Sequence, residues 1–292
     1  MIFQDFFDLL PTDIHKKGKE FEHVTKWWLS EDPIWASQFK NIWLWNEFPK
    51  KSTRDVGIDL VAEDVDGGYW AIQCKAYDPS SSLKKADIDS FLSTSNRILY
   101  SNRILITTTK SIGANARETL ATQEKPVKLV DWTRLCDSPV DWALFNSKKG
   151  ATKAKPRDLR GHQRAALNKV VDGFASSDRG QLIMACGSGK TLTALRIHEA
   201  LASKVTIVLV PSLTLLSQTL NDWLQDRKIE FKWLAVCSDD SVTNDPQDNS
   251  RLIDFDFPAT TKVPEVVTFL KSKGNKVIFS TYHSYPILLH SL

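Results

Sequence analysis

One short segment, residues 184–191, constrains the fold of this chain more than any other. It reads Met-Ala-Cys-Gly-Ser-Gly-Lys-Thr, after a short apolar run at 181–183 and before a helical pattern at 192–201. The run predicts a buried strand, and the pattern predicts a helix. A strand, a glycine-rich loop and a helix form the setting in which backbone N–H groups and a helix N-terminus bind phosphate. The segment therefore predicts a nucleotide-binding α/β domain.

The residues of this loop are expected to contact different parts of a bound triphosphate. The predicted ligands are Gly187, Ser188, Gly189, Lys190 and Thr191. Lys190 would reach the β- and γ-phosphates, and Thr191 would hold Mg²⁺. Met184 stands where the usual motif has its first glycine, and the resulting Ala-x-x-Gly-x-Gly-Lys-Thr resembles the phosphate loop of superfamily 2 helicases and translocases. The alternative is a glycine-rich turn that happens to precede Lys-Thr.

Bulk properties narrow the class of protein. A length of 292 residues suggests about two domains. The net charge of +3 is too small to indicate a nucleic-acid partner by itself. The four cysteines form no Cys-x-x-Cys pair, so neither a zinc site nor a disulfide framework is indicated. The acidic N-terminus does not resemble a signal peptide, and no apolar run approaches the ~20 residues of a membrane helix. We expect a cytoplasmic protein with no membrane partner.

A small, basic segment closed by a proline divides the chain at residues 146–157. Its composition is typical of a linker, so we expect domains at 1–145 and 158–292. A solvated tether is the simpler interpretation of its lysines, and a contact with a DNA backbone is the alternative.

Strands and helices alternate in both halves. In the first half, helices are predicted at 16–30, 84–99 and 115–123, and strands at 42–45, 58–63, 69–75, 103–108 and 127–131. In the second half, helices are predicted at 162–174 and 213–223, strands at 205–210, 233–237 and 277–281, and a long polar loop at 238–263. We expect a mixed sheet flanked by helices in the first half and a parallel sheet in the second.

A candidate catalytic group lies on the hairpin of the first half. Gln73 and Lys75 are two residues apart and share one face of a strand, and the turn at 64–68 brings Asp59 across from them. Oxygen ligands hold Mg²⁺, the metal polarises a phosphate and activates a water, and a lysine stabilises the developing charge. Asp78, just past the strand, is a further acid within reach. The alternative is a solvated lysine and a strand-end acid, with metal affinity weakened by the neutral Gln73.

The hairpin resembles the core of PD-(D/E)xK nucleases, in particular the Mrr-like branch, where glutamine occupies the second acidic position as Gln73 does. Residues 18–22 resemble the first helix of that branch, which supplies another carboxylate, from Glu22 or from Glu20. The resemblance extends to residues 127–135 and implies an Mg²⁺ site formed by Asp59, Gln73 and Glu22.

Further segments of the second half resemble superfamily 2 motors. Gln163 matches the glutamine that reads adenine in that family, with Arg160 in support, although a polar helix start explains both equally well. Residues 210–218 and 280–284 resemble motifs Ia and Ib, which bind the phosphates of the tracked strand. No acidic ATPase motif follows residue 284, so we expect an incomplete RecA-like lobe.

A nuclease placed directly before such a motor resembles the N-terminus of Type ISP restriction-modification enzymes, which are single polypeptides. That resemblance implies double-stranded DNA as partner, ATP as cofactor of the complete enzyme, and further motor, methyltransferase and target-recognition domains. A repair or recombination helicase with a non-cutting first domain is the runner-up, and a nucleotide-binding module with a structural first half is third. We expect contacts with DNA to go mainly to its phosphates, whatever the DNA sequence. Lys84, Lys85 and Lys110 are available for such contacts.

Overall fold

The computed structural model describes residues 1–51, 57–125, 127–145, 155–237, 257 and 259–291. The chain forms two compact units. Unit 1 comprises Met1–Thr152 with a short later segment that includes Phe257, and unit 2 comprises Lys153–Asp248 and Pro258–Leu292. The expected linker at 146–157 lies outside the described residues up to position 154.

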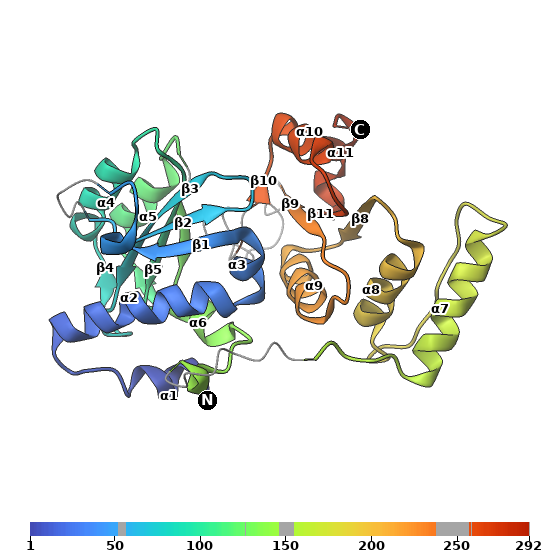
Figure 1. The fold of residues 1–292 in the computed structure, drawn as a ribbon, viewed down its shortest axis with the longest axis horizontal. Coiled ribbons are helices and arrows are strands. Elements are labelled where there is room, and N and C mark those ends of the chain that lie inside the picture. Colours follow the sequence, from blue (N-terminus) through green and yellow to red (C-terminus); the bar gives the residue numbers. More distant parts are fainter. Residues whose placement is uncertain (52–56, 126, 146–154, 238–256, 258, 292) are drawn as a thin grey trace. The chain divides into compact units, whose positions relative to one another are not determined.

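Unit 1 contains a five-stranded mixed sheet in the order β1-β2-β3-β5-β7 (Figure 1). Its strands are β1 (Phe39–Leu44), β2 (Leu60–Asp64), β3 (Tyr69–Lys75), β5 (Tyr100–Thr107) and β7 (Val127–Val130). The pairs β1/β2 and β2/β3 are antiparallel, and β3/β5 and β5/β7 are parallel. The mixed sheet expected from the sequence is therefore confirmed.

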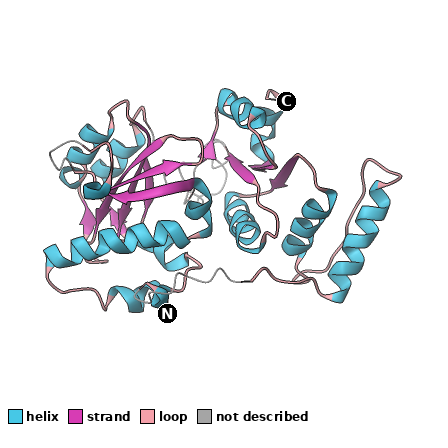
Figure 2. Ribbon diagram, viewed as in Figure 1, coloured by secondary structure: helices cyan, strands magenta, loops and turns pink. Residues whose placement is uncertain are grey.

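Helices cover both faces of this sheet (Figure 2). They are α1 (Phe3–Phe7), α2 (Ile14–Glu31), α3 (Pro33–Gln38), α4 (Asp89–Ser95), α5 (Ala114–Ala121) and α6 (Trp132–Asp137). A small separate pair is formed by β4 (Ser82–Leu83) and β6 (Ser111–Ile112). The long helix α2 starts where the Asp13 side chain accepts a hydrogen bond from Lys16 N, and it buries Phe21, Val24 and Trp28. The predicted helix at 16–30 is thus confirmed with its apolar face.

The helix predicted at 84–99 is wrong in extent. The segment forms β4, a 3-10 turn at Lys85–Asp87 and the seven-residue α4. The Asp87 carboxylate accepts a hydrogen bond from Lys84 N at 2.7 Å. This bond caps the start of the 3-10 turn, so helical structure begins at Lys85, and α4 ends at Ser95.

A buried polar network joins α2, α3 and α6. Asp32 is fully buried, and its Oδ2 accepts hydrogen bonds from Arg134 Nη2 and Ser138 Oγ, both at 2.8 Å. Its Oδ1 accepts from Ile34 N at 3.1 Å, where it caps α3. Trp28 Nε1 donates to the same Ser138 hydroxyl at 2.9 Å. The network connects elements more than 100 positions apart in the sequence and satisfies a charge that would otherwise be costly to bury.

Unit 2 contains a four-stranded parallel sheet in the order β10-β9-β11-β8. The strands are β8 (Val205–Val210), β9 (Lys232–Val236), β10 (Ala259–Thr260) and β11 (Lys276–Thr281). The helices are α7 (Gly161–Phe174), α8 (Lys190–Leu201), α9 (Leu213–Asp226), α10 (Val263–Lys271) and α11 (Tyr285–Leu289). The predicted parallel sheet is confirmed. Most of the polar loop predicted at 238–263 lies outside the described residues, and its end contains β10.

The strand predicted at 181–183 is not formed. These residues have no regular structure, Leu182 is 42% exposed and Ile183 is 90% exposed. A strand requires a neighbour for its backbone groups, and none of the strands in the described sheet pairs with this segment. The apolar run is therefore left in contact with solvent.

The start of unit 2 is anchored to α9. Arg157 N and Arg157 Nε donate to the two carboxylate oxygens of Asp226 at 2.9 and 2.8 Å. Asp226 is almost fully buried. Arg157, the last residue of the predicted linker, is therefore bound to unit 2, and the linker is not a solvated tether along its whole length. No helix in the described part of the chain has the length and apolar character that a membrane span requires.

Candidate nuclease and nucleotide sites

The hairpin brings Asp59 opposite Gln73 at one end of the unit 1 sheet. Leu60 pairs with Ile72 in the antiparallel ladder, and Asp59 N donates to Ile72 O at 2.9 Å, one residue before β2 begins. Asp59 is thereby held next to Gln73, with Lys75 two residues further along β3. The structure places the three predicted residues in one neighbourhood.

The backbone fixes the orientation of the two oxygen-bearing side chains. Asp59 Oδ2 accepts a hydrogen bond from Cys74 N at 2.7 Å. Gln73 is 4% exposed, and its Nε2 donates to Gly57 O at 3.1 Å. Among the described residues, Gln73 Oε1 has no hydrogen-bond partner although it is buried. A buried amide oxygen in this state lacks compensation for its desolvation, which makes it a suitable ligand for a cation.

A glycine makes the bond to Gln73 feasible. Gly57 has a φ of +77°, and a Cβ at this position would lie 2.7 Å from Ser90 Oγ. A larger residue would be strained in this conformation and would crowd Ser90. The sequence Gly57-Ile58-Asp59 therefore positions both the carbonyl that orients Gln73 and the carboxylate beside it.

The two faces of β3 have different neighbours. Ala71, two residues before Gln73, belongs to a buried cluster with Phe91 of α4 and Leu120 of α5. Gln73 and Lys75 follow the same alternation and face that side. Cys74 faces the other side, where it meets Thr25 of α2. The helix that carries Glu22 thus covers the opposite face from Gln73 and Lys75.

Nearby charged groups shift the pKa of the Cys74 thiol. Burial, followed by the carboxylate of Asp59, raises the pKa of this thiol well above its usual value. Glu22 raises it further, whereas Thr25 and Lys75 act in the opposite direction. Asp59, Glu22 and Lys75 therefore all lie within electrostatic range of one atom on β3.

Helix geometry distinguishes the two candidate glutamates. Thr25 lies three residues after Glu22, about 60° away around α2, and therefore shares its side of the helix. Glu20 is turned by about 200° from Glu22. Glu22 is half-buried, and its Oε1 accepts from Lys19 Nζ at 3.0 Å. The side of α2 that meets Cys74 carries Glu22 and not Glu20.

Asp78 has other surroundings. It is exposed, and its Oδ1 accepts from Ser80 N and Ser80 Oγ at 2.8 and 2.5 Å in a turn after β3. The hydrogen bonds from Ser80 lower the pKa of the Asp78 carboxyl. It lines a groove with Lys17 and Lys110, and none of Asp59, Gln73 and Lys75 lines that groove.

The donor set suits a hard cation only if amide oxygen and water take part. In the described part of the chain, no three His, Cys, Asp or Glu side chains gather closely enough to hold a metal ion. Asp59 and Gln73 lie opposite each other across the hairpin, whereas Glu22 lies on the helix that covers the other face of β3. Mg²⁺ is usually bound through one or two carboxylates and several waters, so the residues fit this ion.

The phosphate loop of unit 2 closes around its own lysine. Lys190 Nζ donates to Met184 O and Ala185 O at 3.3 and 3.1 Å, and Ser188 Oγ donates to Ala185 O at 2.7 Å. Gly187 and Gly189 have φ values of +73° and +81°. Lys190 and Thr191 begin α8, at the helix end that favours anions. The ammonium group of Lys190 is thus hydrogen-bonded to carbonyl groups of its own loop.

The predicted adenine-reading glutamine contacts this loop. Gln163 is buried, its Nε2 donates to Ser188 O at 3.0 Å, and its Oε1 accepts from Arg160 N at 2.8 Å. His162, which sequence reasoning did not single out, has its Nε2 at 3.1 Å from the same Ser188 O. In the sequence, only the position of His162 next to Gln163 indicates a contact with the loop. Both side chains link the start of α7 to the loop.

The segments expected to bind DNA phosphates lie in ordered positions. Ser212, in the segment resembling motif Ia, accepts from Leu215 N and caps α9. Thr281 and Ser284, in the segment resembling motif Ib, share a hydrogen bond at 3.0 Å. In unit 1, Lys85 pairs with Asp89 at 2.7 Å, and Lys110 Nζ lies 5.4 Å from the centre of the Trp132 ring. Lys84 is exposed.

Comparison with known proteins gives each unit a relative. Residues 30–152 match the Mrr_cat_2 family, described as restriction endonuclease, and this range contains Asp59, Gln73 and Lys75 but not Glu22. Residues 157–289 match the ResIII family, described as Type III restriction enzyme, res subunit. A comparison with curated protein sequences gives no match.

A solved structure resembles the whole chain. It is described as the ATP-dependent Type ISP restriction-modification enzyme LlaBIII bound to DNA, with 30% identity and a TM-score of 0.83. The match covers 100% of this chain and 19% of that one. This chain combines an Mrr_cat_2 nuclease domain with a ResIII helicase-like domain and is similar over its whole length to part of a Type ISP enzyme. The predicted family and fold are thereby confirmed.

Two further structures match parts of the chain. The first, a nuclease-deletion mutant of the Type ISP enzyme LlaGI in complex with a DNA substrate mimic, is 36% identical, has a TM-score of 0.38 and covers 46% of this chain and 14% of that one. The second, the MspJI restriction endonuclease in complex with an oligonucleotide, is 17% identical, has a TM-score of 0.32 and covers 46% of this chain and 29% of that one. The chain thus spans less than a fifth of either Type ISP relative.

Proposed function

We propose that unit 1 is a metal-dependent DNA endonuclease whose active site contains Asp59, Gln73 and Lys75, with Glu22 as a further carboxylate. The observation that supports this assignment most is the buried, unpartnered Oε1 of Gln73 beside Asp59, among the described residues. Lys75 follows on the same face of β3. Phosphodiester hydrolysis requires such a combination of oxygen ligands and a cation.

Each residue has a separate role in this proposal. When bound, Mg²⁺ would polarise the scissile phosphate and lower the pKa of an attacking water. Asp59 and Gln73 Oε1 would hold the ion, and Glu22, on the helix over the opposite face of β3, would reach it only through a water. Lys75 donates hydrogen bonds to the phosphate oxygens as negative charge develops on them. The bond from Gln73 Nε2 to Gly57 O keeps the amide oxygen turned toward the ion.

Unit 2 would supply the nucleotide site of an ATP-driven translocase. Gly187, Ser188, Gly189, Lys190 and Thr191 would bind Mg²⁺ and the phosphates of ATP, and Gln163 would contact the adenine. In this proposal the complete enzyme moves along double-stranded DNA, and methyltransferase and target-recognition parts belong to the same polypeptide. The support is the 30% identity and the fold shared with LlaBIII, which is described as ATP-dependent.

The first test is DNA cleavage by the chain in the presence of Mg²⁺ or Mn²⁺. Nicking of supercoiled plasmid should fall to background in Asp59→Ala and in Lys75→Ala, because removing a metal ligand or the charge-stabilising group removes transition-state stabilisation. Circular dichroism and thermal melting of both variants should match the unsubstituted chain.

A matched control uses a lysine of the same unit outside this neighbourhood. Lys50→Ala should cut as well as the unsubstituted chain, because Lys50 lies over the ring of Tyr69, at the opposite end of β3 from Lys75. Full cleavage by both Asp59→Ala and Lys75→Ala would contradict the assignment. DNA binding with no metal-dependent nicking by the unsubstituted chain would favour a non-cutting DNA-binding domain.

A further inference from the structure

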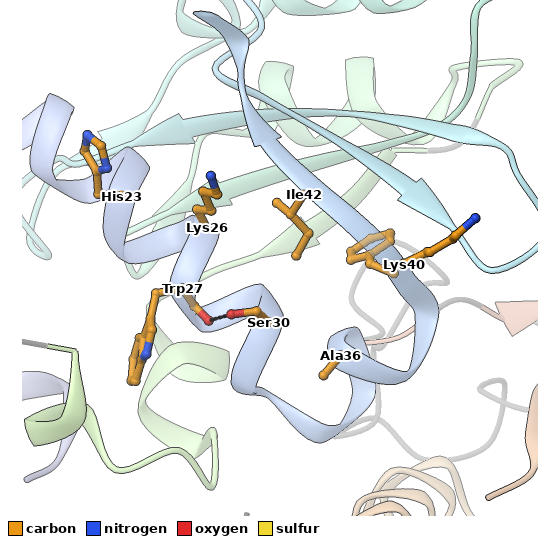
Figure 3. Close-up of a pocket in the computed structure, with 8 residues that line it drawn as sticks. His23, Lys26, Trp27, Ser30, Ala36, Lys40 and Ile42 are labelled. Atoms are coloured by element: carbon orange, nitrogen blue, oxygen red, sulfur yellow. Dashed lines mark hydrogen bonds between the residues drawn. The ribbon is translucent and has the colours of Figure 1, made fainter. Parts of the chain in front are cut away.

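A basic hollow lies on the outer side of α2, where the helix meets the edge strand β1 (Figure 3). Its volume is about 360 Å³. His23, Lys26 and Lys40 contribute nitrogen groups, and Trp27, Phe39 and Ile42 contribute apolar surface. All of these residues belong to unit 1.

The charge of this α2–β1 groove is one-sided. Two lysines and a histidine line it, and no carboxylate is among its lining residues. Lys26 Nζ pairs with Glu47 at 2.6 Å, yet about a third of the Lys26 side chain stays exposed. The other groove of unit 1 differs, because its two lysines, Lys17 and Lys110, are matched by Asp8 and Asp78. Charge therefore favours an anionic occupant for the α2–β1 groove.

The apolar lining is held rigidly. The Trp27 ring packs against Trp142 and Phe145 with centroid distances of 5.8 and 5.6 Å, and Phe39 packs against Trp35 at 5.7 Å. Lys40 is exposed on β1 and points outward (Figure 3). An apolar floor with cations at its rim matches a polymer in which sugar units alternate with phosphates.

The groove starts beside the proposed nuclease site. His23 follows Glu22 directly on α2, and Lys26 lies one turn after Glu22 on the same side of the helix. At the far end of β1, Leu44 pairs with Leu60, the residue after Asp59. An extended strand of six residues spans about 20 Å. A nucleic-acid strand leaving Asp59 therefore has a path along β1 past Lys26 and Lys40.

We propose that the α2–β1 groove binds the phosphodiester backbone of the DNA duplex next to the cleavage position. His23, Lys26 and Lys40 contact successive phosphates, and Trp27 and Phe39 support the sugars between them. The inference rests on the proposed endonuclease function, and it concerns binding rather than chemistry. Contacts of this kind position DNA without reading its sequence.

Binding of a short fluorescent duplex to the full chain, in EDTA, tests the groove. Lys40→Glu should weaken binding about five- to tenfold at low salt and reduce the log–log salt slope by about one, as expected for a lost phosphate contact. His23→Ala should weaken binding less. Arg97→Glu is the matched control, since it changes the net charge equally on the exposed turn before β5. Arg97→Glu should change the affinity for DNA less than about twofold, because it alters only the long-range electrostatic attraction of the protein for DNA.

Crosslinking locates the contact independently of affinity. A duplex with azidophenacyl groups on its phosphorothioates should attach to the peptide that contains residues 23–40 after illumination, and Lys40→Glu should reduce that product. Equal losses in Lys40→Glu and Arg97→Glu, crosslinks only outside this peptide, or no duplex binding by the unsubstituted chain would each overturn the proposal.

The outcomes separate this proposal from the nuclease assignment. Groove-dependent binding without metal-dependent nicking would keep the groove and remove the nuclease function. In the opposite outcome, nicking depends on Lys75 while binding is unchanged in Lys40→Glu and no crosslink forms at residues 23–40. That result would support the nuclease assignment and contradict DNA binding by the groove.

Discussion

At the scale of single residues, the amide of Gln73 illustrates what a neutral ligand offers. Two carboxylates at adjacent buried positions repel each other before a cation arrives, and one of them then tends to bind a proton. An amide oxygen avoids this repulsion, and its nitrogen can be tied to the backbone, as Gln73 Nε2 is to Gly57 O. Compared with a carboxylate, however, an amide ligand offers the metal ion one negative charge fewer. The proposed site would therefore combine a preorganised ligand geometry with modest electrostatic attraction for the metal ion.

The two glutamates of α2 should differ in their contribution to DNA cleavage. Glu22→Ala should reduce Mg²⁺-dependent nicking at least about tenfold, because a metal-site carboxylate contributes several kcal/mol to transition-state stabilisation. Glu20→Ala should leave nicking within about twofold, since Glu20 is turned by about 200° from Glu22. Initial nicking rates as a function of Mg²⁺ concentration compare the two. The reverse order of effects would assign the role to Glu20.

The Cys74 thiol provides a test of proximity that needs no catalysis. The Asp59 carboxylate raises the pKa of this thiol, second only to burial. Asp59→Asn should therefore lower that pKa, increase the thiolate fraction at a given pH and speed alkylation of Cys74 several-fold. Mass spectrometry of iodoacetamide-treated protein at several time points would measure the rate at each cysteine. The exposed Cys186 of unit 2 is the internal control and should not change. An unchanged Cys74 rate would place Asp59 outside its electrostatic range.

At the scale of elements, the Asp32 network holds α2, α3 and α6 together. Asp32→Ala should lower the free energy of unfolding of unit 1 by about 3–5 kcal/mol, because it removes the buried carboxylate that pairs with Arg134 and accepts from Ser138. Urea denaturation followed by tryptophan fluorescence would measure the change.

The control for this prediction is an exposed ion pair of the same unit. Lys85→Ala should cost no more than about 0.5 kcal/mol, because Lys85 and Asp89 are each about half exposed. Similar costs for Asp32→Ala and Lys85→Ala would show that the buried network contributes no more than a surface pair.

The site and the elements differ in how far the sequence predicts them. Residues 58–75 combine alternating apolar positions with a glycine turn, so both register and face follow from local pattern, and Asp59, Gln73 and Lys75 meet as expected. The face of Glu22 follows from the period of α2. The orientation of the Gln73 amide depends on a carbonyl 16 positions away, and no local pattern encodes that bond.

Element ends and lone segments were harder to predict. The helix expected at 84–99 starts as a 3-10 turn, which the Asp87 carboxylate caps by accepting from Lys84 N, and α4 ends at Ser95. The apolar run at 181–183 has the composition of a strand but no neighbour in the described sheet. Asp78 is near Lys75 in sequence, yet its carboxylate is used by a turn with Ser80. In each case a tertiary or side-chain contact decided the outcome.

At the scale of the whole molecule, the chain consists of two compact units, so a single unfolding transition is not expected. Mg-ATP should raise the unfolding midpoint of unit 2 alone, and tenfold saturation over Kd corresponds to about 1.4 kcal/mol of stabilisation. Differential scanning calorimetry with and without Mg-ATP measures both transitions. Lys190→Ala should remove the shift and leave the transition of unit 1 unchanged. A shift of equal size in Lys190→Ala would show that nucleotide binds elsewhere.

The edge strand β8 of unit 2 has a consequence for how the protein behaves in concentrated solution. It is the last strand of the described sheet, and its sequence Val-Thr-Ile-Val-Leu-Val contains no charge and no proline. Its six residues are all partly or largely accessible to solvent. Natural sheets usually protect such an edge with a lysine, a proline or a bulge, because unpaired N–H and C=O groups template pairing with another chain. The colloidal stability of this chain is therefore limited at β8, and a lysine at Ile207 would act as a gatekeeper against edge-to-edge aggregation.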